Sequence, residues 1–133
     1  MDRTAYLNIA GKEYPMRFSL GASIAMSKRF GSLEKMTEGL DGGDESKTME
    51  DLVWITELMI KQGCAYKNLF EKDVPIPDNA PVEDGKYIPL KAEEIAVGLS
   101  VMDMGELKDK IYATVSGGKK TDIKTETKNA VTT

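Results

Sequence analysis

The chain has 133 residues, of which 41% are hydrophobic and 30% are charged, and both fractions are typical of one folded domain. Its net charge of −4 is uneven, because residues 1–116 carry 14 basic and 20 acidic side chains whereas residues 117–133 carry four basic and two acidic ones. Because an acidic body repels phosphate, we expect no nucleic-acid partner.

Residues 4–18 alternate between apolar and polar side chains, which is the pattern of a half-buried β-hairpin. A two-residue turn at Ala10-Gly11 places Leu7 opposite Tyr14 on the paired strand. The apolar face predicted from this register consists of Ala5, Leu7, Ile9, Tyr14, Met16 and Phe18. A two-stranded ribbon is marginal alone in water, so we expect it to rest on a helix.

Two short helices are predicted after the hairpin. Ser19 is a suitable N-cap for the first, which ends at Gly31, and its expected apolar stripe is Leu20, Ile24, Met26 and Phe30. Ser32 caps the second, which runs through Leu40. Residues 41–47 are predicted to be a loop, and their acidic side chains lack the ligand spacing of an EF-hand.

A long central helix is predicted from the start signal at residues 48–51 to Phe70. Its main apolar stripe is Met49, Leu52, Val53, Ile55, Met59, Ile60, Tyr66 and Phe70. A second stripe, on nearly the opposite side, is Trp54, Leu58, Ala65 and Leu69. Either the helix is sandwiched within its own domain, or the second stripe is exposed and binds another chain. These four residues are therefore the candidate partner-binding residues.

Four prolines among residues 71–89 predict an extended connector without a helix. A slip in helical phase then predicts two helices, one with Ile95, Leu99 and Met102 on its apolar face, the other with Met104, Leu107, Ile111 and Val115. Asp103 with Glu106 is the expected cap at the break, and Glu93 and Glu94 suit a helical first turn. Gly117-Gly118 is the expected stop.

The predicted fold is mainly α. An N-terminal β-hairpin packs on a small bundle of four to five helices in a domain that covers residues 1–116. Residues 117–133 are rich in lysine and threonine, and they are expected to form a disordered polar tail.

The chain contains no histidine and only one cysteine, Cys64. The lack of histidine removes Ser-His-Asp and Cys-His catalysis and histidine-ligated zinc, and Cys64 falls in an apolar helical pattern typical of a buried thiol. We find no phosphate-binding loop or nucleophile elbow, so we predict that the protein is not an enzyme and uses no metal or cofactor. No apolar run approaches the ~18 residues of a membrane span, and a secretion signal is lacking, so we expect a soluble cytoplasmic protein.

The segment LNIAGKEYPMRFSLGASIAMSKRFG, residues 7–31, resembles the start of the tail assembly chaperones of long, flexible-tailed bacteriophages and prophages of Gram-positive hosts. Those proteins commonly have a strand, a Gly-Lys-Glu-Tyr turn, a second strand ending in Arg-Phe-[ST], and a helix closing on Phe-Gly. Here residues 11–14, 17–19 and 30–31 match those three motifs. The long helix, the proline-containing connector and the Glu93-Glu94 helix start are similar too, so the resemblance covers roughly residues 4–116.

The resemblance implies a non-catalytic virion-assembly factor that works in the host cytoplasm and is absent from the mature virion. Its partner would be the tape measure protein, a very long helical polypeptide whose apolar surface aggregates unless it is covered. The tail tube protein is a further candidate partner, and self-association is implied as well. Two other interpretations remain open, namely a small structural tail or connector protein of the virion and a helical adaptor domain unrelated to phage.

Overall fold

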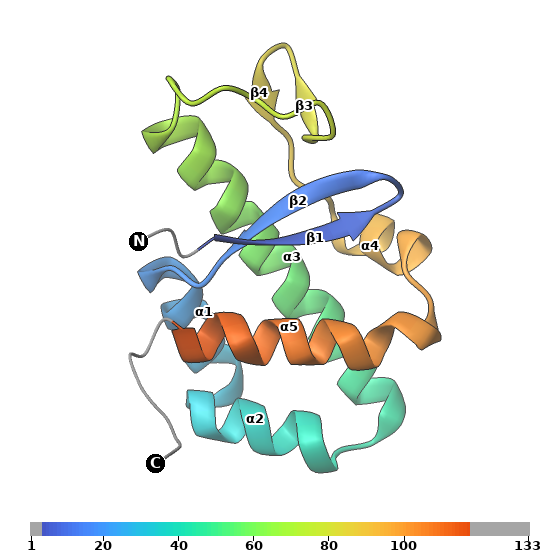
Figure 1. Ribbon diagram of the computed structural model, residues 1–133. Coiled ribbons are helices and arrows are strands. Elements are labelled where there is room, and N and C mark those ends of the chain that lie inside the picture. Colours follow the sequence, from blue (N-terminus) through green and yellow to red (C-terminus); the bar gives the residue numbers. More distant parts are fainter. Residues whose placement is uncertain (1–3, 118–133) are drawn as a thin grey trace, which may run out of the picture.

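The β-hairpin is the first element of the fold. In the computed structural model, which describes residues 4–117, β1 (Thr4–Ile9) pairs antiparallel with β2 (Lys12–Arg17), and Leu7 lies opposite Tyr14 (Figure 1). The predicted two-residue turn and strand register are therefore confirmed.

Helices dominate the rest of the described residues. They are α1 (Leu20–Phe30), α2 (Leu33–Gly42), α3 (Glu45–Phe70), α4 (Ala92–Gly98), the 3₁₀ turn η1 (Val101–Asp103) and α5 (Met104–Gly117). Two short strands, β3 (Val82–Glu83) and β4 (Lys86–Tyr87), pair within the connector between α3 and α4. The mainly α class is confirmed, whereas all of the predicted tail beyond Gly117 lies outside the described residues.

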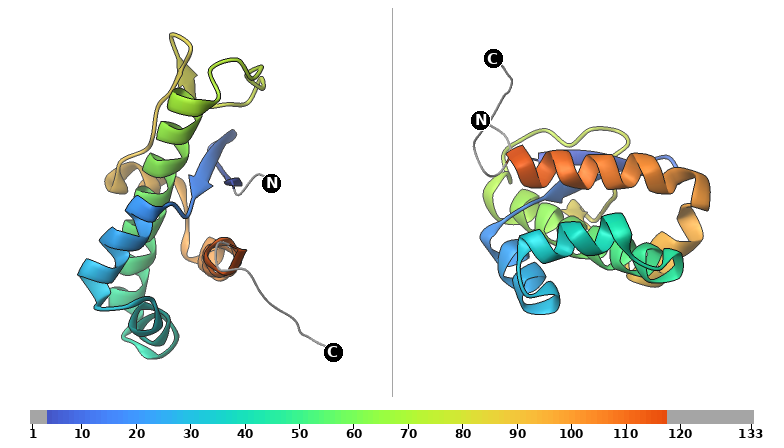
Figure 2. Two further views of the ribbon diagram at one scale, coloured as in Figure 1. Left: turned by 90° about the vertical axis from the view of Figure 1, so that its left-hand side faces the viewer. Right: turned by 90° about the horizontal axis from the view of Figure 1, so that it is seen from below.

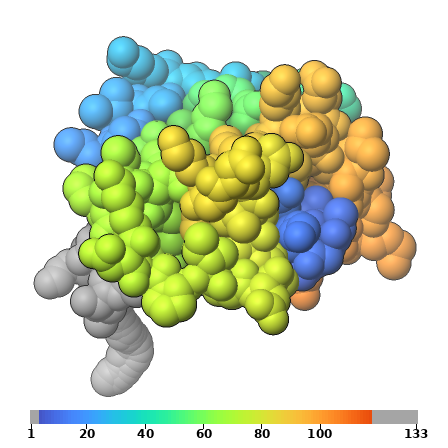
Figure 3. Space-filling model, turned by 90° about the horizontal axis from the view of Figure 1, so that it is seen from above, coloured from blue at the N-terminus to red at the C-terminus, as the bar shows by residue number. Residues whose placement is uncertain are grey.

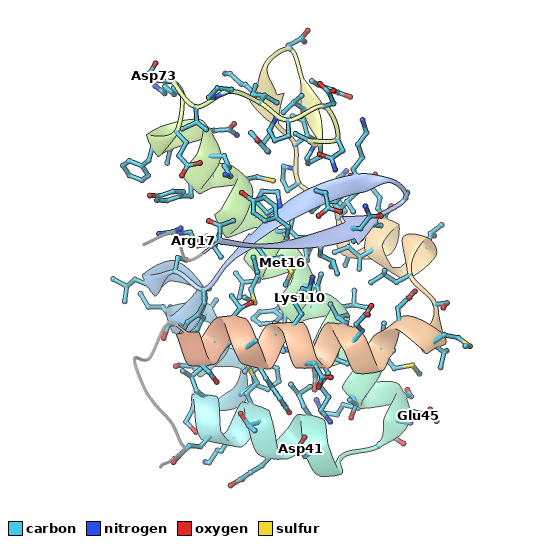
Figure 4. The ribbon with its side chains drawn as sticks, in the orientation of Figure 1. Met16, Arg17, Asp41, Glu45, Asp73 and Lys110 are labelled. Atoms are coloured by element: carbon cyan, nitrogen blue, oxygen red, sulfur yellow. The ribbon has the colours of Figure 1, made fainter. Side chains whose placement is uncertain are left out.

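Helix α3 is the central support of the domain. Figure 2 (left) shows α1 and α3 side by side, with the hairpin and α5 together on one side of them. The core between these layers contains the fully buried side chains Met16, Met26, Ile55, Met59 and Ile111. The Lys110 ammonium of α5 donates to the Tyr6 carbonyl of β1 at 2.6 Å, and this bond joins the last described helix to the first strand (Figure 4).

The caps of the first two helices are as predicted. The Ser19 hydroxyl accepts a hydrogen bond from the Ala22 amide at 3.0 Å, and the Ser32 hydroxyl accepts one from the Lys35 amide at the same distance. Gly31 ends α1 with a φ of 94°, a left-handed conformation that glycine adopts without steric cost.

The predicted apolar stripe of α1 is wrong at two positions. Leu20 is 79% exposed and Ile24 is 49% exposed, whereas Met26 is buried as predicted and Ala22, which the stripe did not include, is buried too. The Ser19 hydroxyl also donates to the side-chain carbonyl of Gln62 on α3. This bond holds the start of α1 against α3 and turns the Ala22 and Met26 face inward, so Leu20 and Ile24 face solvent.

The predicted loop at residues 41–47 and the predicted helix start at Thr48 are also wrong. Helix α2 extends to Gly42, and α3 begins at Glu45 because the Asp44 carboxylate accepts from the Lys47 amide at 3.1 Å. Asp51, which the start signal treats as a capping residue, is only 4% exposed and binds Arg29 and Lys47 instead. A buried ion pair and a helix cap use the same residue types, so the pattern misassigned Asp51.

The predicted break between the last two helices is confirmed, but its cap is different. The Asp103 carboxylate accepts from the Ser100 amide at 2.8 Å, which forms a capping box with Ser100 in place of the expected Asp103 and Glu106. Met102 is 91% exposed because the chain turns at η1 before α5 begins, so it does not share the buried face of Ile95. The connector contains no helix, as predicted, although the short β3–β4 pair was not expected.

Candidate partner-binding surface

An open groove of about 640 Å³ lies between α3, α4 and the end of α1. We call it the Trp54 groove. Its α3 side is lined by Ser46, Met49, Val53 and Trp54, and its α4 side by Ala92 and Ala96. Its floor is mostly apolar, which is the usual character of a surface that binds an apolar partner.

The spacing of small side chains explains why the Trp54 groove is hollow. Ser46, Met49 and Val53 are three and four residues apart, so they lie along one face of α3. Ala92 and Ala96 are four residues apart and share one face of α4. Each alanine contributes only a methyl group, so α4 does not fill the space in front of that face.

Two neighbours from α1 hold the Trp54 ring in place. Phe30 meets the ring in an edge-to-face arrangement, with centroids 5.9 Å apart and planes at 81°, and the Arg29 guanidinium lies 4.6 Å from the ring centroid. The ring is half-buried and lines the groove.

A partly buried hydrogen bond attaches the start of α4 to α3. The Glu57 carboxylate accepts from the Ala92 amide at 2.8 Å, and the Glu94 carboxylate accepts from the Lys91 amide at 2.8 Å. Glu93 and Glu94 therefore lie in the first turn of α4, as predicted. The bond to Glu57 joins the start of α4 to α3, whereas the bond between Lys91 and Glu94 caps α4 itself.

Charged side chains form the rim of the groove. Arg29 on α1 donates to Asp51 at 3.1 Å, and Lys47 donates to the other oxygen of the same carboxylate at 2.9 Å. Glu50 on α3 and Glu93 on α4 are exposed, and neither forms a salt bridge with any of residues 4–117. The charges at the rim that lack an ionic partner are therefore acidic.

A second hollow, of about 560 Å³, lies at the far end of α3, between the end of that helix and the β3–β4 pair. Figure 3 is a view of this end of the molecule, with the connector facing the viewer. Leu69 lines it and is 63% exposed, and Val74 and Ile76 from the connector line it too. Phe70, which the periodicity assigns to the main stripe, is also exposed here. The charged side chains that line this hollow are of both signs, namely Lys67, Lys72, Lys86 and Glu71.

The four predicted partner-binding residues do not form one continuous surface. Trp54 lies in the groove, whereas Leu69 lies in the far hollow. Leu58 is half-buried and packs against the core, and Ala65 is exposed but lines neither hollow. Periodicity along α3 could not reveal Ala92 and Ala96, because they reach the groove only through the tertiary placement of α4.

The described residues include one buried thiol and no grouped metal ligands. Cys64 is buried, and its burial raises the pKa of the thiol to about 12, so the thiolate that a nucleophile needs does not form at neutral pH. Within residues 4–117, no three acidic or cysteine side chains are grouped as metal ligands. No helix in the same range is both long and apolar enough for a membrane span.

Comparison of the chain with protein-family models, with curated proteins and with solved structures found no match.

Proposed function

We propose that this protein is a non-catalytic phage tail assembly chaperone that binds the tape measure protein and keeps it soluble during tail morphogenesis. The observation that carries the proposal is the Trp54 groove, a preformed apolar surface bounded by two helices. The motif pattern of residues 7–31 supports the same proposal from the sequence.

The groove suits a helical partner. An amphipathic helix binds by placing its apolar stripe in a groove, and each Å² of apolar surface removed from water contributes ~25 cal/mol. Tryptophan is enriched among the residues that dominate binding energy, and Trp54 is already oriented by Phe30 and Arg29. Covering an apolar helix in this way lowers the concentration of the species that aggregates.

The charge of the domain supports the same role. A net negative body keeps a protein and its complexes dispersed through mutual repulsion, and residues 1–116 carry six more acidic than basic side chains. Under this proposal the protein acts in the host cytoplasm, associates with further copies of itself, and is absent from the mature virion.

Co-expression with the tape measure protein of the same genome tests the proposal. The exposed Ala96 permits a sharp variant, because Ala96→Glu places a charge in the groove without touching the core. Ala113→Glu is the matched control, since Ala113 is an exposed alanine of α5 outside the groove. We expect the wild-type protein and the control to keep the tape measure protein in the supernatant, and Ala96→Glu to reduce the soluble yield at least about threefold.

Equal solubility of the tape measure protein with and without this chain would contradict the proposal. Mass spectrometry of purified virions distinguishes a chaperone from a structural tail or connector protein. A chaperone is found in the lysate and is missing from mature tails, whereas a tail or connector protein is present in both.

A further inference from the structure

The rim of the Trp54 groove carries a specific charge pattern. Glu50 on α3 and Glu93 on α4 come from the two helices that line the groove, and both are exposed without a salt bridge to residues 4–117. The one basic side chain that lines the groove, Arg29, is already bound to Asp51 and lies over the Trp54 ring. A partner in the groove therefore meets an apolar lining that carries one unneutralised carboxylate from each of the two helices.

We infer that the Trp54 groove selects helices whose apolar stripe is flanked on both sides by lysine or arginine. This inference rests on the proposed function, because it names the chemistry of the client segment that the groove accepts. Such a helix places its apolar stripe on Met49, Val53 and Trp54 and its two basic flanks beside Glu50 and Glu93.

The geometry of long basic side chains fits this arrangement. The aliphatic stems of lysine and arginine lie along apolar surface while their charged ends reach outward, so they cover the edges of the floor and still meet the two carboxylates. A helix with acidic flanks would instead place like charges together at both walls. Arg29 already binds the Asp51 carboxylate, which it shares with Lys47, and its guanidinium lies over the Trp54 ring.

The expected selectivity is modest and sensitive to salt. Exposed charge pairs contribute little individually, and ions screen them over a Debye length of ~10 Å at ~0.1 M salt. A helix with basic flanks forms two attractive charge pairs with Glu50 and Glu93, whereas a helix with acidic flanks forms two repulsive ones. We expect this difference to give a preference of about tenfold in affinity at low salt. The preference should shrink as salt is added, because the apolar contribution stays while the ionic contribution is screened.

Trp54 supplies the measurement, because it is the one tryptophan of the chain and it lines the groove. Two synthetic helical peptides without tryptophan, each about five turns long, would carry the same leucine stripe. One is flanked by lysines and the other by glutamates. Titration of the full chain with each peptide, followed by Trp54 fluorescence emission, gives the two affinities directly.

Charge variants of the rim complete the experiment. Glu50→Gln with Glu93→Gln should remove the preference for the lysine-flanked peptide, and Glu50→Lys with Glu93→Lys should reverse it about tenfold. Glu38→Lys with Asp109→Lys is the control for the double lysine variant. Both residues are exposed and lie outside the groove, and the two substitutions change the net charge as much as Glu50→Lys with Glu93→Lys does. Circular dichroism confirms that every variant is folded.

The results separate the two proposals. A preference of the wild-type protein for the lysine-flanked peptide, lost in the glutamine variant and retained in the control, supports the inference. Equal binding of both peptides, or the same preference in the lysine variant, overturns it while leaving the groove as a helix-binding surface. If neither peptide changes Trp54 emission, the inference fails, and the co-expression experiment with Ala96→Glu decides the proposed function independently.

Discussion

The carbonyl oxygen of Pro15 lies directly over the α carbon of Gly63, where strand β2 crosses helix α3. A β carbon built on Gly63 would be 2.2 Å from that oxygen and 2.9 Å from the Met16 amide nitrogen. No side chain other than hydrogen fits there, so the hairpin and the central helix meet backbone to backbone. This contact places the buried Met16 side chain in the core.

Gly63→Ala should therefore destabilise the fold by about 3 kcal/mol, because the added methyl group must push β2 away from α3. Urea denaturation measures the free energy of unfolding. Gly39→Ala is the matched control in α2, where an added β carbon meets nothing within 4 Å. It should raise stability by roughly 0.5–1 kcal/mol through helix propensity. If both variants were equally stable, the close approach at Gly63 would not position the hairpin.

The hairpin register and the starts of α1 and α2 were predictable from the sequence, whereas the start of α3 and the buried face of α1 were not. Alternation over residues 4–18 specified the hairpin register, and serine residues specified the starts of α1 and α2. The exposure of Leu20 and Ile24 depends on the bond between Ser19 and Gln62, which are 43 residues apart. Periodicity within a single helix contains no information about such a contact.

The hairpin turn offers a stabilising substitution. Ala10 has a φ of 53° and Gly11 a φ of 85°, so both turn residues are left-handed, as a type I′ turn requires. Alanine is strained in that conformation, whereas asparagine tolerates it. Ala10→Asn should raise the free energy of unfolding by about 0.5–1 kcal/mol, and Ala10→Val should lower it. Urea midpoints measure both variants, and a gain with valine would contradict the turn assignment.

The side chain of Asn68 on α3 forms two hydrogen bonds to the connector backbone. The Asn68 amide group donates to the Tyr87 carbonyl at 3.0 Å, and its carbonyl oxygen accepts from the Tyr87 amide at 2.9 Å. Asn68→Asp replaces the donor with a carboxylate oxygen that faces the Tyr87 carbonyl, so we expect a loss of about 1–3 kcal/mol.

Limited proteolysis should show faster cleavage between α3 and α4 in Asn68→Asp than in the wild-type protein. Asn79→Asp is a suitable control, because Asn79 is an exposed connector residue that contributes only its backbone carbonyl, to the Glu13 amide. Equal cleavage rates in the two variants would show that Asn68 does not hold the connector.

Two leucines of the predicted second stripe should respond differently to charge. Leu58 packs against the core, so Leu58→Glu should destabilise the domain by about 2 kcal/mol. Leu69 is 63% exposed, so Leu69→Glu should change stability by less than about 0.5 kcal/mol. Thermal denaturation followed by circular dichroism distinguishes them, and similar losses at both positions would place Leu69 in the core.

The buried Cys64 thiol should make the free energy of unfolding vary with pH in the alkaline range. Burial raises the pKa of Cys64 from an ordinary 9.0 to about 12, so above pH 9.0 the unfolded chain releases a proton that the folded chain keeps. The folded state then binds more protons than the unfolded state, and stability falls as pH rises from 9.0 towards about 12. Cys64→Ala should show a shallower decline in urea midpoint over that range. An identical slope would mean that Cys64 is not the group responsible.

The candidate site was only partly predictable. Tryptophan within an apolar stripe identified Trp54, but the same stripe also contained Leu58, whose side chain packs on the core. Ala92 and Ala96 gave no signal, because an alanine pair on a helix is common and becomes part of a groove only opposite another helix. Glu93 fits a helical first turn, and its place at the rim follows from where α4 docks.

The bond between Lys110 and Tyr6 joins residues 104 positions apart in the sequence. The ribosome synthesises β1 long before α5. Leu7 of β1 therefore emerges without Leu107 of α5, and these two residues line a small hollow together in the folded domain. A nascent chain therefore cannot complete its tertiary structure during synthesis until α5 has left the exit tunnel. A fragment that ended within the connector would lack α5, so the side of the hairpin that α5 covers would be open to water.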